Sequence, residues 1–222
     1  LKVAFPLNVL TPVATYDIQF GHVQRPTHEN TSWDKAKFEV CAHKYADISE
    51  GDYGISIIND CKYGHDIHDG VMQLSLLRAP TYPYPDADQG ESECTYSIMP
   101  HNCSFSECDV IKQAYYLNYP MVAIPAKGEK DSLPVAFSAV TVNSENVICE
   151  TVKQAEYGED TIIRLYESAN IRTDLEVTLG IPAKEVYICD MMENETEKLE
   201  VKDGKVCLKV NGFEIVTLKV KA

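Results

Sequence analysis

The sequence predicts an all-β protein that is divided into two sandwich-like parts. Three observations predict this class. Apolar and polar residues alternate with period two along most apolar segments, whereas helical periodicity is scarce. Dipeptides that favour tight turns stand between these segments. A chain of 222 residues is also long enough for one large β-domain or for two smaller ones, each with its own core.

The first half of the chain supplies several candidate strands. Residues 38–42 place apolar side chains on one face, and residues 53–57 alternate in the same way. An Asp-Gly dipeptide at residues 69–70 is a hairpin signal directly before the alternating segment 71–77. A further mostly apolar run, residues 111–119, is grouped with these strand-like segments and is broken by a proline.

The last twenty residues show the clearest alternation. Asp-Gly at 203–204 and Asn-Gly at 211–212 both favour the left-handed backbone that two-residue hairpin turns require. Residues 206–210 between them carry apolar side chains on one face, and residues 213–220 alternate after them. We therefore expect a three-stranded meander at this end of the chain.

A change in composition predicts a domain boundary. Residues 126–133 are mostly polar and contain a glycine, which is typical of a linker or a long surface loop. We expect residues 1–125 to form part of a large β-sandwich and residues 134–222 to form a small C-terminal β-sandwich. The proline-rich stretch 80–90 is a second irregular segment.

The charge of the chain excludes several classes of partner. Its formal net charge is −14, from 34 acidic and 20 basic residues. An acidic surface repels phosphate backbones and anionic lipids, so neither nucleic acid nor membrane is an expected partner. No apolar run approaches the roughly 20 residues that cross a bilayer. Because the chain begins inside a strand-like segment and no signal peptide precedes it, we interpret it as a fragment of a longer protein.

The eight cysteines favour a reducing compartment. Cys103 and Cys108 share a short polar loop, and their spacing fits no zinc module. The free-looking thiols and the absence of a signal peptide together indicate a cytoplasmic location. Five other cysteines lie in strand-like runs and are expected to be small buried hydrophobic residues. These are Cys41, Cys94, Cys149, Cys189 and Cys207.

Two groups of residues suggest chemistry without establishing it. His65, Asp66, His68 and Asp69 carry groups that bind divalent ions, but in a strand the two histidines point to opposite faces. A solvated polar loop is the alternative. Cys61 lies near these histidines and is either a nucleophile or a structural thiol. The chain has neither a Gly-x-Ser-x-Gly elbow nor a phosphate-binding glycine loop, and its many acids single out no carboxylate pair for glycosidase chemistry.

A series of longer motifs carries a family resemblance. In this order, the motifs resemble the C-terminal β-region of the family 38 α-mannosidases, in particular the cytosolic and bacterial branch. The resemblance is dense over residues 5–120 and looser but continuous to the end of the chain. The motifs are residues 14–34, FEVCAHKYAD (38–47), YGISIINDCKYG (53–64), LSLLRAP (74–80), ADQG (87–90) and MPH (99–101).

This resemblance implies both a fold and a role. The first part is expected to be a portion of a mutarotase-like antiparallel supersandwich, followed by the small sandwich. The complete enzyme is implied to hydrolyse terminal α-mannosides with retention, using zinc or another divalent ion. Its nucleophile and metal ligands belong to an N-terminal catalytic barrel that this sequence does not contain. The chain is therefore expected to hold no catalytic residue, metal ligand or cofactor, and to be inactive alone. Its implied partners are that catalytic domain and an α-mannoside oligosaccharide.

The resemblance also implies that a loop of this region reaches the rim of the sugar pocket. Sugar hydroxyls bind carboxylates and exposed carbonyl groups, and sugar rings pack on aromatic faces. The alternative for both candidate loops is that they hold the sheet geometry or dock the catalytic domain. The candidate rim residues are Asp60, Cys61, Lys62 and Tyr63 in the first loop, and Asp88 and Gln89 in the second.

Two other functions remain open at this point. The chain is alternatively a stand-alone carbohydrate-binding β-sandwich module, or its sheet faces mediate assembly into oligomers. Trp33 is the only tryptophan. We expect it to pack in a core or at an interface in preference to acting as a sugar platform.

Overall fold

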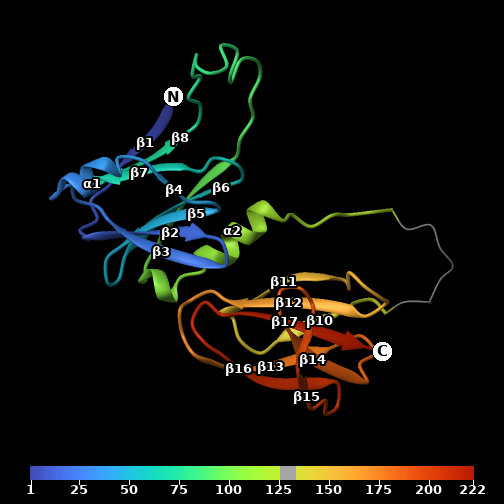
Figure 1. The fold of residues 1–222 in the computed structure, drawn as a ribbon. Helices are drawn as coiled ribbons and strands as arrows, with labels where there is room; N and C mark the ends of the chain where they lie inside the picture. Colours follow the sequence, from blue (N-terminus) through green and yellow to red (C-terminus); the bar gives the residue numbers. More distant parts are fainter. Residues whose placement is uncertain (126–133) are drawn as a thin grey trace. The chain divides into compact units, whose positions relative to one another are not determined.

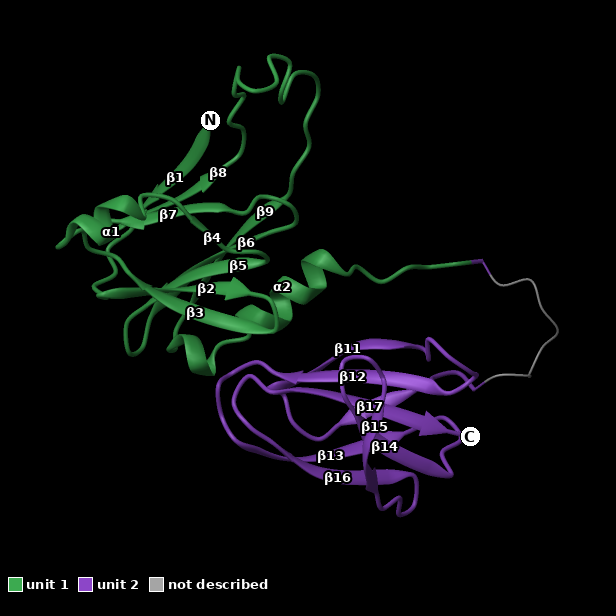
Figure 2. Cartoon of the chain, viewed as in Figure 1, with its two compact units in different colours: residues 1–124 green, residues 125–222 purple. Residues whose placement is uncertain are grey.

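The computed structural model describes residues 1–125 and 134–222, which form two compact units (Figure 2). Unit 1 comprises residues 1–124, and unit 2 comprises residues 125–222. The linker or loop expected at 126–133 lies outside the described residues. The predicted division into domains at 1–125 and 134–222 stays a prediction.

The all-β class is confirmed, since most elements of both units are antiparallel strands (Figure 1). The elements of unit 1 are β1 (Lys2–Pro6), β2 (Val13–Ile18), β3 (Gly21–Pro26), α1 (Ser32–Ala36), β4 (Val40–Cys41), β5 (Tyr45–Ser49), β6 (Gly54–Asn59), β7 (Gly64–His68), β8 (Val71–Ser75), β9 (Tyr96–His101), the 3-10 helix η1 (Phe105–Glu107) and α2 (Val110–Asn118).

Unit 1 is built from two antiparallel sheets that share one core. The five-stranded sheet has the order β3-β2-β5-β6-β9, and the four-stranded sheet has the order β1-β8-β7-β4. Tyr16 and Ile57 of the first sheet pack with Met72 and Leu74 of the second. The opposite face of the five-stranded sheet packs against α2, so β6 is buried on both faces.

The hairpin predicted at residues 69–70 is confirmed. β7 and β8 pair in antiparallel register from His65 opposite Leu74 to His68 opposite Val71. Asp69 and Gly70 have φ values of 51° and 72°, the left-handed conformation that a two-residue hairpin turn requires.

The apolar run at residues 111–119 forms the helix α2 and not a strand. Val110 and Ala114 are its buried residues and lie four positions apart, so one helical face packs on the sheet beneath. A short apolar run without clear alternation does not distinguish a strand from a buried helix. No helix among the described residues is long and apolar enough to cross a membrane.

Unit 2 is a smaller sandwich with a core of its own. Its sheets have the orders β11-β12-β17-β14-β15 and β10-β13-β16. Leu165 and Leu218 of the larger sheet pack against Leu175 and Val206 of the smaller one. The strands are β10 (Val140–Val142), β11 (Val147–Gln154), β12 (Thr161–Glu167), β13 (Thr173–Leu179), β14 (Glu185–Cys189), β15 (Glu195–Leu199), β16 (Lys205–Val210) and β17 (Ile215–Lys221).

The predicted three-stranded meander is wrong, although its strands exist. β16 pairs with β13 in the smaller sheet, whereas β17 pairs with β12 and β14 in the larger sheet. The connection at residues 211–214 therefore crosses from one sheet to the other. Alternation shows which face of a strand is buried, but both a hairpin and a crossing between facing sheets satisfy that pattern.

Candidate functional site

The candidate site is a surface hollow of about 470 Å³ within unit 1. Three segments and one further side chain, that of Glu39, form its walls. The segments are the turn after β6, the end of β8 with the residues that follow it, and part of the connection between β8 and β9. The hollow thus brings together both loops that the sequence analysis selected. The lining residues are Glu39, residues 61–64, residues 75–78, Asp88, Gln89, Glu91 and Ser92.

The turn after β6 is held by a buried asparagine. Asn59 is fully buried, and its side-chain amide donates to the carbonyl of His43 (2.9 Å). Its side-chain oxygen accepts the backbone N–H of Lys62 (2.7 Å), which closes the turn. Asn118 of α2 donates to the Asn59 carbonyl (3.0 Å). The turn is therefore held both by the backbone at His43, just before β5, and by the helix α2.

Asp60 is the one selected residue that does not line the hollow. Both of its carboxylate oxygens accept the backbone N–H of Thr95 (3.0 Å each). A hydrogen bond from the Cys61 thiol, together with those from Thr95, holds the pKa of the Asp60 carboxyl below its usual range. In this structure Asp60 joins the turn to the chain just before β9.

Cys61 lines the hollow but is a poor nucleophile. Its hydrogen bond to Asp60, together with partial desolvation and the negative charge of that carboxylate, raises the pKa of the thiol to about 11. The nucleophilic form of cysteine is the thiolate, and at neutral pH Cys61 is held as the thiol. The structure thus favours a structural thiol over a catalytic one.

Tyr63 supplies an aromatic face at the hollow. Its side chain is half-exposed and packs edge-on against His43, with the ring centroids 5.2 Å apart. Lys62, its neighbour in the turn, adds a cationic side chain to the lining. The next residue, Gly64, begins β7 and lies close to Glu39, because a Cβ atom added at Gly64 would lie 2.5 Å from Oε1 of Glu39.

Glu39 and Arg78 form an ion pair in the lining that the sequence analysis did not select. Glu39 has a side chain only 9% exposed, and its Oε2 lies 3.0 Å from Nη1 of Arg78. Its Oε1 accepts the hydroxyl of Ser75 on β8. Arg78 is largely exposed beyond this contact. Glu39 and Arg78 lie 39 positions apart, so no local pattern could have joined them.

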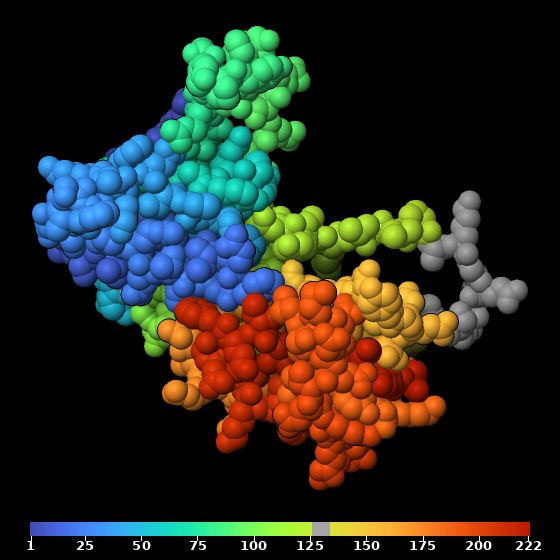
Figure 3. Space-filling view, in the orientation of Figure 1, coloured from blue at the N-terminus to red at the C-terminus, as the bar shows by residue number. Residues whose placement is uncertain are grey.

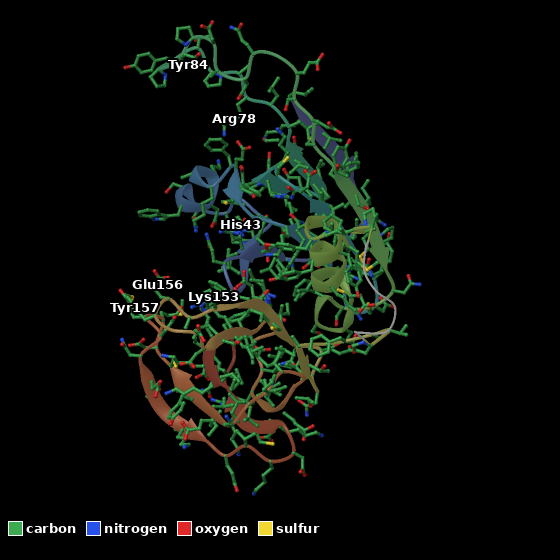
Figure 4. The ribbon with its side chains drawn as sticks, turned by 90° about the vertical axis from the view of Figure 1, so that its right-hand side faces the viewer. His43, Arg78, Tyr84, Lys153, Glu156 and Tyr157 are labelled. Carbon is green, nitrogen blue, oxygen red and sulfur yellow. The ribbon has the colours of Figure 1, made fainter. Side chains whose placement is uncertain are left out.

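The second selected loop belongs to the long connection at residues 76–95, which projects from unit 1 (Figures 2 and 3). Arg78 lies at its beginning and Tyr84 at its outer end (Figure 4). The Asp88 carboxylate accepts the backbone N–H groups of Arg78 (3.3 Å) and Ala79 (2.8 Å), which closes the base of the loop. Gln89 donates to the Pro85 carbonyl (3.4 Å).

The lining has the chemistry of a polyhydroxyl binder. Carboxylates accept hydrogen bonds from hydroxyl groups, the lysine and arginine donate to sugar oxygens, and a tyrosine presents a ring face. Two carboxylates of the lining, those of Glu39 and Asp88, already accept hydrogen bonds from other residues of unit 1. The hollow can therefore hold a polar ligand of modest size without supplying a nucleophile.

The histidine and aspartate cluster at residues 65–69 is not a solvated loop. It forms strand β7 and its hairpin turn, and no group of three metal-binding side chains occurs in the described part of the chain. His65 is fully buried, and burial lowers its pKa to about 4. His68 faces the other way and contacts Asp66, with Nδ1 2.7 Å from Oδ1. The expected opposite orientation of the two histidines is confirmed.

The expectation that five cysteines are buried is wrong for most of them. Cys189 is buried, whereas Cys41 and Cys207 are exposed and Cys94 and Cys149 are half-buried. All eight cysteines are free. Strand membership alone did not identify the buried face, because both exposed cysteines lie in strands, β4 and β16. Trp33 on α1 is 80% exposed, so it does not belong to a core of unit 1.

Two family models match this all-β chain, and both describe C-terminal regions of one family of glycosyl hydrolases. Residues 1–86 match the glycosyl hydrolases family 38 C-terminal domain. Residues 146–218 match the glycosyl hydrolases family 38 C-terminal beta sandwich domain. Together the two matches span most of the chain, which belongs to the C-terminal region of glycosyl hydrolase family 38.

Individual relatives agree with this assignment. The chain is 44% identical to alpha-mannosidase 2C1 of Mus musculus, over 98% of the chain and 21% of that protein. It is 40% identical to alpha-mannosidase G of Dictyostelium discoideum, over 93% of the chain and 19% of that protein. The chain thus spans about a fifth of the length of these relatives.

A solved structure has the same fold. The crystal structure of an alpha-mannosidase from Enterococcus faecalis V583 superposes with a TM-score of 0.83 at 19% identity. The match covers 99% of this chain and 25% of that one. The expected all-β fold of antiparallel sheets is confirmed by this likeness.

Proposed function

We propose that this chain is the non-catalytic C-terminal part of an α-mannosidase that hydrolyses terminal α-mannosides with retention. The observation that carries the proposal is the identity of 44% to an alpha-mannosidase along nearly the whole chain. The nucleophile and the zinc or other divalent ion belong to a catalytic domain outside these residues. The described residues contain no group that fits such an ion, and no step of the reaction is assigned to them.

Unit 1 supports that catalytic domain and contributes the hollow to the rim of the mannose pocket. Two features support this role. The hollow gathers five of the six selected residues, and the sixth, Asp60, ties the turn to Thr95. Unit 1 also exposes large aromatic side chains that a docked domain would cover. These are Trp33, Phe38, Tyr82 and Tyr84.

The complete polypeptide tests the rim assignment. Tyr63→Ala removes the aromatic face of the hollow, and we expect KM for a chromogenic α-mannoside to rise about tenfold, because one sugar–aromatic contact of about 1.4 kcal/mol is lost. Tyr53→Ala is the matched control, since Tyr53 is also part-exposed but lies outside the hollow. Equal kinetic constants for the wild type and Tyr63→Ala would show that the turn does not contribute to the mannose pocket.

The isolated chain tests the absence of catalysis. We expect no turnover of the same substrate by residues 1–222, with or without added zinc. Turnover that follows the chain through purification and is lost in a variant of the hollow would contradict the proposal.

The free thiols support a reducing, cytoplasmic location for the enzyme.

A stand-alone carbohydrate-binding module is the second candidate function. One observation favours it, because all walls of the hollow come from unit 1. Titration of the isolated chain with mannose oligomers, followed by tyrosine and tryptophan fluorescence, distinguishes the two functions. A saturable response that is lost in Tyr63→Ala supports the binding module. The absence of a response at millimolar sugar rejects the module, and the rim role in the complete enzyme is then the remaining candidate.

A further inference from the structure

Two cysteines flank the point where the pairing of β6 and β9 ends: Cys61 comes two residues after β6, and Cys94 comes two residues before β9. The last strand pair is Asn59 with Tyr96. One residue further, the N–H of Asp60 donates to the Thr95 carbonyl (3.1 Å), so the antiparallel register continues beyond both strands. Extended by one further step, the same register would bring Cys61 opposite Cys94.

A direct contact supports this placement. The Cys61 sulfur lies 4.0 Å from the carbonyl oxygen of Glu93, the residue directly before Cys94. In a regular antiparallel ladder, the pair that follows a hydrogen-bonded pair has no backbone hydrogen bonds of its own. The Cα atoms of such pairs lie about 4.5 Å apart, which falls within the range of about 4.4–6.8 Å that a disulfide spans.

We propose that Cys61 and Cys94 form a reversible disulfide at the edge of the hollow. The oxidant is a low-molecular-weight disulfide, RSSR. One thiolate of the pair attacks a sulfur of RSSR, breaks its S–S bond and expels RS⁻, which takes up a proton. The second thiolate attacks the cysteine sulfur of this mixed disulfide and expels the other RS⁻. The two cysteines are oxidised, and RSSR is reduced to two RSH.

The bond would join two walls of the hollow. Cys61 is itself in the lining, and Cys94 lies two residues after Ser92, which lines the hollow from the connection at residues 76–95. Oxidation would therefore restrain the turn against the connection at residues 76–95, and reduction would release it. This consequence for ligand binding rests on the proposed function, whereas formation of the bond does not.

The full 222-residue chain tests the bond directly. The protein is equilibrated with oxidised and reduced glutathione and quenched with N-ethylmaleimide, and its peptides are mapped by mass spectrometry. We expect a peptide pair that joins Cys61 to Cys94 and disappears with dithiothreitol. Cys61→Ser should leave Cys94 as a glutathione adduct, whereas Cys207→Ser, at an exposed cysteine of unit 2, should leave the bond intact. A disulfide from Cys61 to a cysteine other than Cys94 would overturn the proposal. So would the absence of any disulfide at Cys61 under conditions in which glutathione modifies Cys207.

The neighbouring carboxylate gives a second measurement. Asp60 keeps the Cys61 thiol protonated, since its hydrogen bond, together with desolvation and the carboxylate charge, raises the pKa of that thiol to about 11. Asp60→Asn removes the charge but not the desolvation, so it should lower this pKa and speed alkylation of Cys61 at pH 7.5 severalfold. The gain in thiolate is partly offset by the lower nucleophilicity of a more acidic thiol. An unchanged rate would contradict the protective role of Asp60.

The complete enzyme separates this proposal from the proposed function. If KM for the α-mannoside shifts on oxidation, returns with dithiothreitol and stays constant in Cys94→Ser, the bond controls the rim. If the polypeptide has no mannosidase activity at all, the proposed function fails while the peptide map still decides the disulfide. A mapped disulfide without any change in KM would refute control of the pocket.

Discussion

The carboxylate of Glu167 joins three separate segments of unit 2. It is fully buried at the end of β12. One oxygen accepts from the side chain of Asn146 and the N–H of Ala169 (2.8 Å each). The other accepts the N–H groups of Asn170 (2.8 Å) and Phe213 (2.9 Å). This single side chain therefore holds the crossing between the two sheets at residues 211–214.

Glu167→Gln should destabilise unit 2 by about 3 kcal/mol, because an amide nitrogen replaces one acceptor and faces donors in a buried site. Urea unfolding followed by circular dichroism measures the change. Glu197→Gln, an exposed change on β15, is the matched control and should alter stability by less than about 0.5 kcal/mol. A loss below about 1 kcal/mol in Glu167→Gln would show that the crossing does not depend on this carboxylate.

The buried His65 predicts a pH dependence of stability. Burial lowers its pKa from 6.5 to about 4 in the folded chain. Between these values the unfolded state binds the proton more tightly than the folded state does. The free energy of unfolding is therefore unaffected by this proton above about pH 6.5 and decreases as the pH drops towards 4. From pH 7.5 to pH 5, His65 should cost about 2 kcal/mol.

Denaturant unfolding of the wild type and of His65→Phe at both pH values measures this cost as a difference, since the carboxylates contribute equally to both proteins. The variant should lose about 2 kcal/mol less than the wild type on acidification. Identical pH dependence would mean that the histidine is hydrated or paired in solution.

At the scale of elements, the turn between β7 and β8 sets the position of the wall that follows it. β8 leads directly into Ser75 and Arg78 of the hollow. Gly70 has a φ of 72°, and a Cβ atom there would lie 3.0 Å from the Leu7 carbonyl oxygen. Residues other than glycine rarely adopt this backbone conformation, so the turn favours glycine at this position.

Gly70→Ala should therefore destabilise unit 1 by about 1–2 kcal/mol. Gly51→Ala is the matched control, because Gly51 has no positive φ and no atom within 4 Å of an added Cβ. Chemical denaturation of both variants measures the difference. Equal stability of the two would show that the turn relaxes at no cost.

Elements were predicted unevenly, and the reasons are physical. The Asp-Gly turn at 69–70 was recognisable because its conformation is a local property of two residues. The helix α2 was missed because a nine-residue helix with two buried positions shows too little periodicity. The pairing of β16 and β17 was wrong because alternation records burial and not the partner strand.

At the scale of the whole molecule, each unit has its own core. The core of unit 2 consists only of residues from that unit, between Val140 and Val220. This observation supports, as a proposal, that residues 134–222 form an autonomous domain. The corresponding segment 1–125 is proposed to be part of a larger sandwich completed by other polypeptide.

Residues 134–222 expressed alone should unfold in one cooperative urea transition, with a midpoint equal to that of unit 2 in the full chain. The reason is that no core residue is removed by the truncation. Hydrogen exchange measures the protection of the amides in β12 and β17, which compares the isolated segment with the full chain residue by residue. A non-cooperative transition would show that unit 2 depends on the preceding residues.

The sequence by itself determined the all-β class, the tight turn at 69–70, the family and the two loops that line the hollow. These features depend on local conformation, on burial patterns or on motifs that are contiguous in the chain. Only the tertiary structure decided that Glu39 and Arg78 complete the hollow, that Asp60 ties the turn to Thr95, and that β16 and β17 lie in opposite sheets. Such contacts join residues far apart in the sequence, and their energy depends on burial and distance in the folded chain, which no local pattern records.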